Sequence, residues 1–175
     1  MNALRSPARR IDFQRIGPIA ASGRRVLVLG YGNPGREDDG LGPAAAAEIE
    51  RVGSKNVSVC SNYQLVIEDV VDIAAADLVW FIDASKTGTA PFEIRQLSPA
   101  LDITFTSHLV KPEVLLALAK QYYGRSPEAY LLGIRGYSFE FCERLSDGGG
   151  ENLPQALSLL LHGIDTTGDG KEPLQ

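Results

Sequence analysis

The sequence predicts an α/β fold: a three-layer sandwich with a mostly parallel twisted sheet and helices on both faces. Two observations support this prediction. Short, nearly continuous apolar runs, such as residues 25–29 and 78–82, have the pattern of strands buried on both faces. Between such runs lie segments with helical spacing or strong helix formers, and strands that alternate with helices typically form covered parallel sheets.

Local signals predict each element in turn. The first strand covers residues 25–29 and ends at Gly30, and Pro43 can open a helix that stops at Gly53. A clear amphipathic helix runs from Pro112 to Tyr123 and closes at Gly124. The other predicted elements are a strand at 56–61, a helix at 66–76, strands at 78–82, 92–97 and 130–134, and a last helix at 153–162.

Length and composition indicate one globular domain. The 175 residues are 44% hydrophobic and 22% charged. We expect a disordered basic N-terminal tail at 1–23, a single α/β domain at 24–164 and a flexible C-terminal tail at 165–175. Two cysteines are too few for a disulfide framework, which predicts a cytoplasmic protein.

The charge is unevenly distributed. Residues 1–25 carry six arginines and one aspartate, a balance of +5, so the net charge of −5 leaves −10 for the rest of the chain. An acidic body argues against a nucleic-acid partner, because phosphate contacts need clustered Lys and Arg. No segment approaches the ~20 apolar residues of a membrane span, so no membrane association is expected.

A glycine motif, Gly30-Tyr31-Gly32-Asn33-Pro34-Gly35, directly follows the first predicted strand. A dinucleotide site needs the next helix to begin within such a motif, so that the helix N-terminus faces the pyrophosphate. Here the helix is predicted only from about Pro43, and Glu37-Asp38-Asp39 place three carboxylates in the intervening loop. The loop is also similar to that of peptidyl-tRNA hydrolase, but the catalytic histidine that family has shortly downstream is missing.

Polar groups follow predicted strand ends at three places. These are the loop after Gly30, Asp83, and His108 beyond the strand at 92–97. In open α/β sheets, ligands bind beyond the carboxyl ends of the strands. We therefore expect the three groups to converge on one rim of the sheet.

In this order and spacing, the motifs resemble the hydrogenase maturation proteases, over residues 25–162. The matching segments are Gly30-Tyr31-Gly32-Asn33, Asp38-Asp39-Gly40-Leu41-Gly42, Phe81-Ile82-Asp83-Ala84 and Ser107-His108. Three further segments resemble the branch that serves NAD-linked, bidirectional-type hydrogenases: Gln64-Leu65, Ser138-Phe139-Glu140 and Leu145-Ser146. The resemblance implies an endopeptidase that removes the C-terminal extension of a nickel-loaded [NiFe]-hydrogenase large-subunit precursor.

The resemblance also implies that Asp39, Asp83 and His108 are the catalytic residues and bind nickel. Two carboxylates and one imidazole suit Ni(II) or Zn(II) and leave positions open for outside ligands. The nickel is therefore expected to arrive with the precursor, which is the expected partner. Each residue has a structural alternative: Asp38 or Asp39 could cap the next helix, Asp83 could be a turn residue, and His108 could lie in a surface loop or the core.

Hydrolysis by a metal-activated or carboxylate-activated water is the expected chemistry, with Glu37 and Asp38 as further candidates for activating the water. A nucleophilic mechanism has little support, because Cys60 and Cys142 read as inert thiols and no serine has an evident triad. His162 is expected to interact with a helix dipole.

Two alternative functions are a non-catalytic, nickel-sensing chaperone of the precursor and a nucleotide-binding module.

Overall fold

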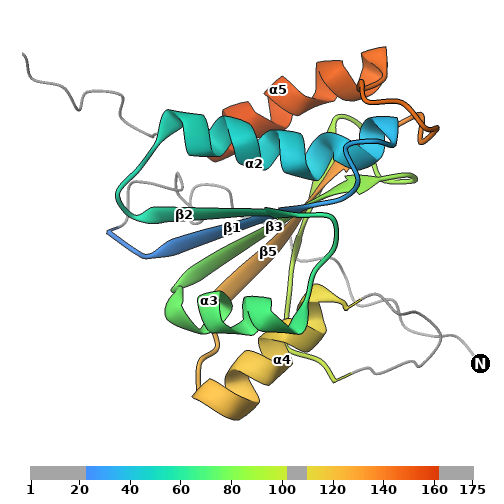
Figure 1. The fold of residues 1–175 in the computed structure, drawn as a ribbon. Helices are drawn as coiled ribbons and strands as arrows, with labels where there is room; N and C mark the ends of the chain where they lie inside the picture. Colours follow the sequence, from blue (N-terminus) through green and yellow to red (C-terminus); the bar gives the residue numbers. More distant parts are fainter. Residues whose placement is uncertain (1–22, 102–109, 162–175) are drawn as a thin grey trace, which may run out of the picture.

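A computed structural model describes residues 23–101 and 110–161 of the chain (Figure 1). Its elements are β1 (Val26–Tyr31), the 3-10 helix η1 (Glu37–Gly40), α2 (Leu41–Val52), β2 (Val57–Asn62), the 3-10 helix η2 (Ile67–Asp69), α3 (Val70–Ala75), β3 (Leu78–Ser85), β4 (Phe92–Gln96), α4 (Pro112–Tyr123), β5 (Glu128–Arg135) and α5 (Asp147–Leu161). The tails predicted at 1–23 and 165–175 lie outside the described residues, apart from Gly23.

The strands form one five-stranded sheet in the order β2-β1-β3-β5-β4. Strands β2, β1, β3 and β5 are parallel to one another, which confirms the prediction of a mostly parallel sheet. Only β4, among the strands of the described residues, runs antiparallel, paired with β5. The carboxyl ends of the four parallel strands therefore share one edge of the sheet, called the rim below.

The direction of β4 corrects one expectation about this rim. Gln96, the last residue of β4, pairs with Tyr130 near the start of β5. A strand antiparallel to its neighbour ends where that neighbour begins, so the chain leaves β4 at the edge opposite the rim. The prediction that the end of this strand belongs to the rim is wrong.

Helices cover both faces of the sheet, with α2 and α5 over one face and α3 and α4 over the other (Figure 1). Side chains in β1 alternate between the two cores: Val26 and Val28 face α2 and α5, whereas Leu27 and Leu29 face α3 and α4. Because successive side chains of a strand point to opposite faces, a strand with a core on each side needs apolar residues throughout. This explains the continuous apolar runs of the sequence.

Two helices begin earlier than predicted. Helical conformation starts with η1 and continues into α2 at Leu41, so Pro43 is the third residue of α2. In the first turn of a helix the N–H groups have no partner within the helix, so the N–H that proline lacks removes no helical hydrogen bond. Helix α5 begins at Asp147 rather than at 153, despite three glycines and Pro154. The Ser146 hydroxyl accepts the Gly149 N–H at 3.1 Å and thereby caps this glycine-rich first turn.

None of the helices within residues 23–101 and 110–161 is long and apolar enough to cross a lipid bilayer.

Candidate active site

The chain passes from β1 into η1 through a tight loop at the rim. Gly32 has a φ of 137°, which L side chains rarely adopt, and a methyl group there would clash with the Asp39 carbonyl. A methyl group on Gly42 would clash with the carbonyl oxygens of Tyr31 and Ile82. The glycines therefore let the start of α2 contact the ends of β1 and β3 directly. In this chain they serve close packing, and the first helical turn is acidic rather than open to a phosphate.

Asp38 is a structural anchor. Its side chain is 0% exposed. Its carboxylate accepts four hydrogen bonds: from the backbone N–H groups of Tyr137, Ser138 and Ser146, and from the Ser146 hydroxyl at 2.6 Å. Burial alone would raise the pKa of Asp38, but these donors outweigh it and lower the pKa below its ordinary value. A buried carboxylate with both oxygens engaged is unsuited to activating a water.

Asp39 points to a different environment from its neighbour. Its Oδ2 accepts the N–H of Asn33 at 3.0 Å, and the side chain is only partly buried. Neither η1 nor α2 has a side-chain cap, and the N-cap position of α2 is Gly40. Neither Asp38 nor Asp39 therefore caps the helix that follows it in the sequence.

Asp83 lies within β3 rather than in a turn, since this strand continues to Ser85. Its Oδ1 accepts the N–H of Ala84 at 2.8 Å. Burial, assisted by the nearby negative charge of Asp39, raises the pKa of Asp83 to about 6, against the opposing effect of hydrogen bonds from Ala84 and Tyr31. Asp39 and Asp83 both lie at the rim, and the charge of Asp39 contributes to the raised pKa of Asp83.

Tyr31 is a member of this site that the sequence did not single out. It ends β1, and its hydroxyl lies near enough to Asp83 to affect the pKa of that carboxyl group. Burial, with the charges of Asp83 and Glu113, raises the pKa of Tyr31 above its ordinary value. A signal was available in the sequence, because Tyr31 carries a hydroxyl at the carboxyl end of a buried strand, where ligands of α/β sheets bind.

The N-terminal end of α4 also lies at the rim. Just beyond the other end of α4, Arg125 hydrogen-bonds the Ala76 carbonyl, close to where β3 begins. Helix α4 therefore starts toward the carboxyl ends of the strands, and Glu113 in its first turn is near enough to affect the pKa of Tyr31. Glu113 is itself paired with Arg95 of β4 at 2.9 Å.

The third predicted site residue, His108, lies outside the described residues, as do Ser107 and His162. Within residues 23–101 and 110–161, no group of three or more His, Cys, Asp or Glu side chains could hold a metal ion. Asp39 and Asp83 both lie at the rim of the sheet, in η1 and near the end of β3. The prediction that His108 joins them stays a prediction, although only four sequence positions separate it from Pro112 at the start of α4.

Cys60 and Ser138 carry potentially nucleophilic groups, but their surroundings disfavour that role. Burial and three neighbouring carboxylates raise the pKa of the Cys60 thiol, which disfavours the reactive thiolate. The Ser138 hydroxyl donates to the Glu37 carboxylate, so both groups hold the 136–146 segment against η1. Glu37 is therefore a poor candidate for activating water.

Comparison with solved structures finds several endopeptidases of similar fold. The [NiFe] hydrogenase maturation protease HycI from Thermococcus kodakarensis KOD1 is 25% identical, with a TM-score of 0.63 over 81% of this chain and 93% of that one. An endopeptidase from Escherichia coli is also 25% identical, with a TM-score of 0.59 over 82% and 94% of the two chains. The hydrogenase maturating endopeptidase HybD from E. coli is 23% identical, with a TM-score of 0.60 over 82% and 94%.

No protein-family model matches the chain, and neither does any of the curated proteins compared with it. The structural relatives nevertheless confirm the resemblance to hydrogenase maturation proteases that the motifs indicated.

Proposed function

We propose that this chain is an endopeptidase of hydrogenase maturation, which removes the C-terminal extension of a [NiFe]-hydrogenase large-subunit precursor. The observation that carries the proposal is the position of Asp39 and Asp83, both at the rim of a sheet whose fold is similar to that of hydrogenase maturation proteases. Both residues come from the motifs on which the sequence resemblance rests. Asp38, the other aspartate of the loop, has a structural role as a buried anchor.

We propose that Asp39, Asp83 and His108 bind nickel carried by the precursor. Each described carboxylate has one oxygen engaged by a backbone N–H, from Asn33 and from Ala84. Such bonds orient a carboxylate and leave lone pairs for a metal ion. Two carboxylates and an imidazole suit Ni(II) and leave coordination positions for ligands supplied by the substrate. Nickel then acts as a recognised part of the substrate.

The chain can also supply the proton acceptor that peptide hydrolysis requires. Water attacks the scissile carbonyl only if its proton is taken up, and a general base works best when its pKa lies near the working pH. In the metal-free protein Asp83 has a pKa of about 6 and is ionised at neutral pH. We propose that Asp83 accepts this proton through a lone pair that the metal does not occupy; bound nickel would lower the pKa, so the raised value describes Asp83 before the precursor binds.

A processing assay tests the function. The protein is incubated with nickel-loaded and nickel-free forms of the large-subunit precursor from the same organism, and the products are resolved by mass spectrometry. We expect a shortened large subunit and a released C-terminal peptide from the nickel-loaded form alone. Binding of the precursor without cleavage would instead favour the non-catalytic, nickel-sensing chaperone, and cleavage of both forms would contradict recognition of nickel.

The isolated protein is expected to hold metal weakly. Structural zinc sites in proteins normally have four ligands, whereas this site supplies two carboxylates and one imidazole, with no thiolate. After dialysis against a mild chelator, elemental analysis should therefore find far less than one metal ion per chain. Retention of a stoichiometric metal would contradict a substrate-borne nickel and indicate a resident catalytic ion.

A further inference from the structure

The segment between β5 and α5, residues 136–146, is an irregular loop that the proposed hydrolysis does not explain. We call it the aromatic loop, because it carries Tyr137, Phe139 and Phe141. Phe141 is 87% exposed and Tyr137 is 52% exposed. Large aromatic side chains gathered on an exposed surface commonly mark an interaction site.

Buried polar groups hold this loop in one conformation. Asp38 accepts hydrogen bonds from both of its ends, at Tyr137 and Ser146. Backbone bonds add to this, since Cys142 donates to the Gly35 carbonyl at 3.1 Å and accepts the Glu37 N–H at 2.8 Å. The loop is thus fixed from beneath while the rings of Tyr137 and Phe141 remain at the surface, which is the arrangement of a preorganised binding surface.

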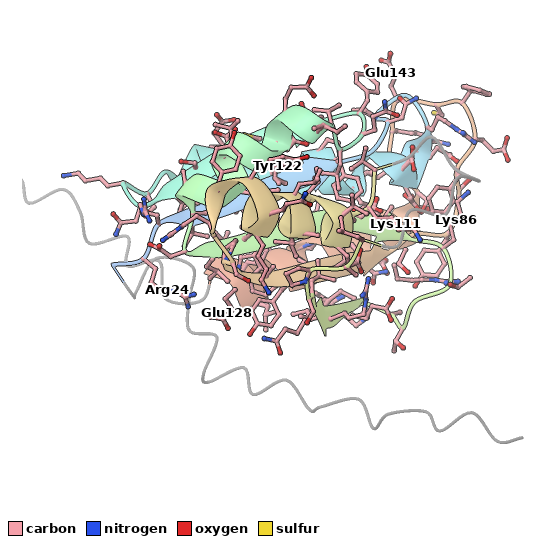
Figure 2. All side chains as sticks on the ribbon, turned by 90° about the horizontal axis from the view of Figure 1, so that it is seen from below. Arg24, Lys86, Lys111, Tyr122, Glu128 and Glu143 are labelled. Atoms are coloured by element: carbon pink, nitrogen blue, oxygen red, sulfur yellow. The ribbon has the colours of Figure 1, made fainter. Side chains whose placement is uncertain are left out.

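Cations lie over all three rings. The Arg36 guanidinium is 5.2 Å from the Phe141 centroid, the Lys86 ammonium is 4.6 Å from that of Phe139, and Arg135 is 5.2 Å from that of Tyr137. All are within the ~6 Å range of a cation–π contact. Arg36 precedes Asp39 by three positions and Lys86 follows Asp83 by three, so this surface borders the proposed active site. Figure 2 shows Lys86 and Lys111 toward one end of the molecule, with Arg24 and Glu128 toward the other.

An apolar groove lies beside the loop. It has a volume of about 290 Å³ and runs between the start of α2 and the last residues of the loop. Pro34, Pro43, Ala44 and Leu145 supply its apolar lining, while Glu143 and Arg144 are among its polar residues. A groove of this size accommodates one or two aliphatic side chains.

We propose that the aromatic loop and this groove dock the precursor through an extended peptide segment with aliphatic and a few acidic side chains. The proposal rests on the proposed function and deepens it by naming a recognition surface. The groove receives the aliphatic side chains, Phe141 packs against the segment, and Arg36, Lys86 and Arg135 face its carboxylates. The carboxylates of Glu140 and Glu143 lie on the same loop, so a densely charged polyanion would be repelled.

Phe141→Ala tests the docking surface, with Tyr122→Ala as the matched control. Tyr122 is 71% exposed but lies on α4, away from the loop (Figure 2). We expect Phe141→Ala to lower kcat/KM for the nickel-loaded precursor by about 10–100-fold through KM, with kcat unchanged, because truncating a central aromatic removes binding energy common to substrate and transition state. Tyr122→Ala should stay within about twofold of the unmodified protein.

A charge reversal tests the role of the cations. Lys86→Glu should raise KM by about 10-fold and weaken the dependence of kcat/KM on salt, whereas Lys55→Glu, an exposed lysine at the opposite edge, should change neither. Thermal melts should be unchanged in all four variants.

Equal kcat/KM for Phe141→Ala and Tyr122→Ala would overturn the docking surface while leaving the protease function intact. If the unmodified protein cleaves no precursor, the proposed function fails, and docking is then measured directly as precursor affinity by calorimetry. In that case, a loss of affinity in Phe141→Ala alone would support the surface. Equal affinity in the two variants, or no binding by the unmodified protein, would overturn it.

Discussion

Replacement of Asp83 by Asn is expected to abolish processing and, at the same time, to make the protein more stable at neutral pH. Activity should fall by ~10²–10⁴-fold, because the change removes both a proposed nickel ligand and the proposed proton acceptor. Stability should rise because Asp83, buried beside the charge of Asp39, has its pKa raised from 3.8 to about 6. That shift corresponds to a cost of ~1–3 kcal/mol for holding the ionised form in the folded state.

The sign of this effect gives the experiment a pH signature. A carboxyl group with a raised pKa in the folded state destabilises the protein as pH rises from its unfolded pKa to its folded pKa. The free energy of unfolding of Asp83→Asn minus that of the unmodified protein should therefore be near zero below pH 3.8 and reach its full value above about pH 6. Taking the difference cancels the titration of the groups that do not interact with Asp83.

Denaturant titrations across this pH range, run beside the processing assay, provide the measurement. A variant that is inactive and destabilised at pH 7 would indicate that Asp83 supports the fold rather than the chemistry. A variant that is more stable and still processes the precursor would remove Asp83 from the mechanism.

His108→Ala should likewise lose processing if His108 supplies the third ligand.

The sequence predicted the sheet because its signals are local and strong. The apolar runs of β1 and β3 need a core on each face, and Pro112 and Gly124 mark the ends of α4 with little ambiguity. The start of α5 could not be found in this way, because Gly148, Gly149 and Pro154 oppose a helix locally. Its first turn is stabilised by Ser146 and Asp38, and Asp38 lies over 100 positions earlier in the chain.

The same limit explains what could be predicted of the site. The motif resemblance selected Asp39 over Asp38, but nothing local distinguishes two adjacent aspartates. Their difference arises from contacts far along the chain: Asp38 is enclosed by Tyr137, Ser138 and Ser146, whereas Asp39 stays at the rim. The direction of β4 was likewise beyond the sequence pattern, since an apolar alternation does not specify which way a strand runs.

Replacement of Asp38 by Ala should unfold the protein far more readily than the same change at Asp39. Four donors around the Asp38 carboxylate would lose their acceptor in a fully buried site. Leaving a buried donor without its acceptor typically costs ~1–3 kcal/mol, and here several donors are affected together. Gly149 packs so tightly against this carboxylate that a methyl group there would clash with it, so the removed side chain would also leave a gap.

Asp39→Ala is the matched control, because its carboxylate is only partly buried and accepts a single backbone N–H, from Asn33. Its unfolding free energy should stay within ~1 kcal/mol of the unmodified protein, while processing is lost. The Asp38 effect should also depend on pH. Because the pKa of Asp38 is lowered in the folded state, its contribution is fully present above pH 3.8 and is lost as the pH falls below that value. Equal melting temperatures for the two variants at pH 7 would contradict the assignment of Asp38 as the anchor and Asp39 as the functional carboxylate.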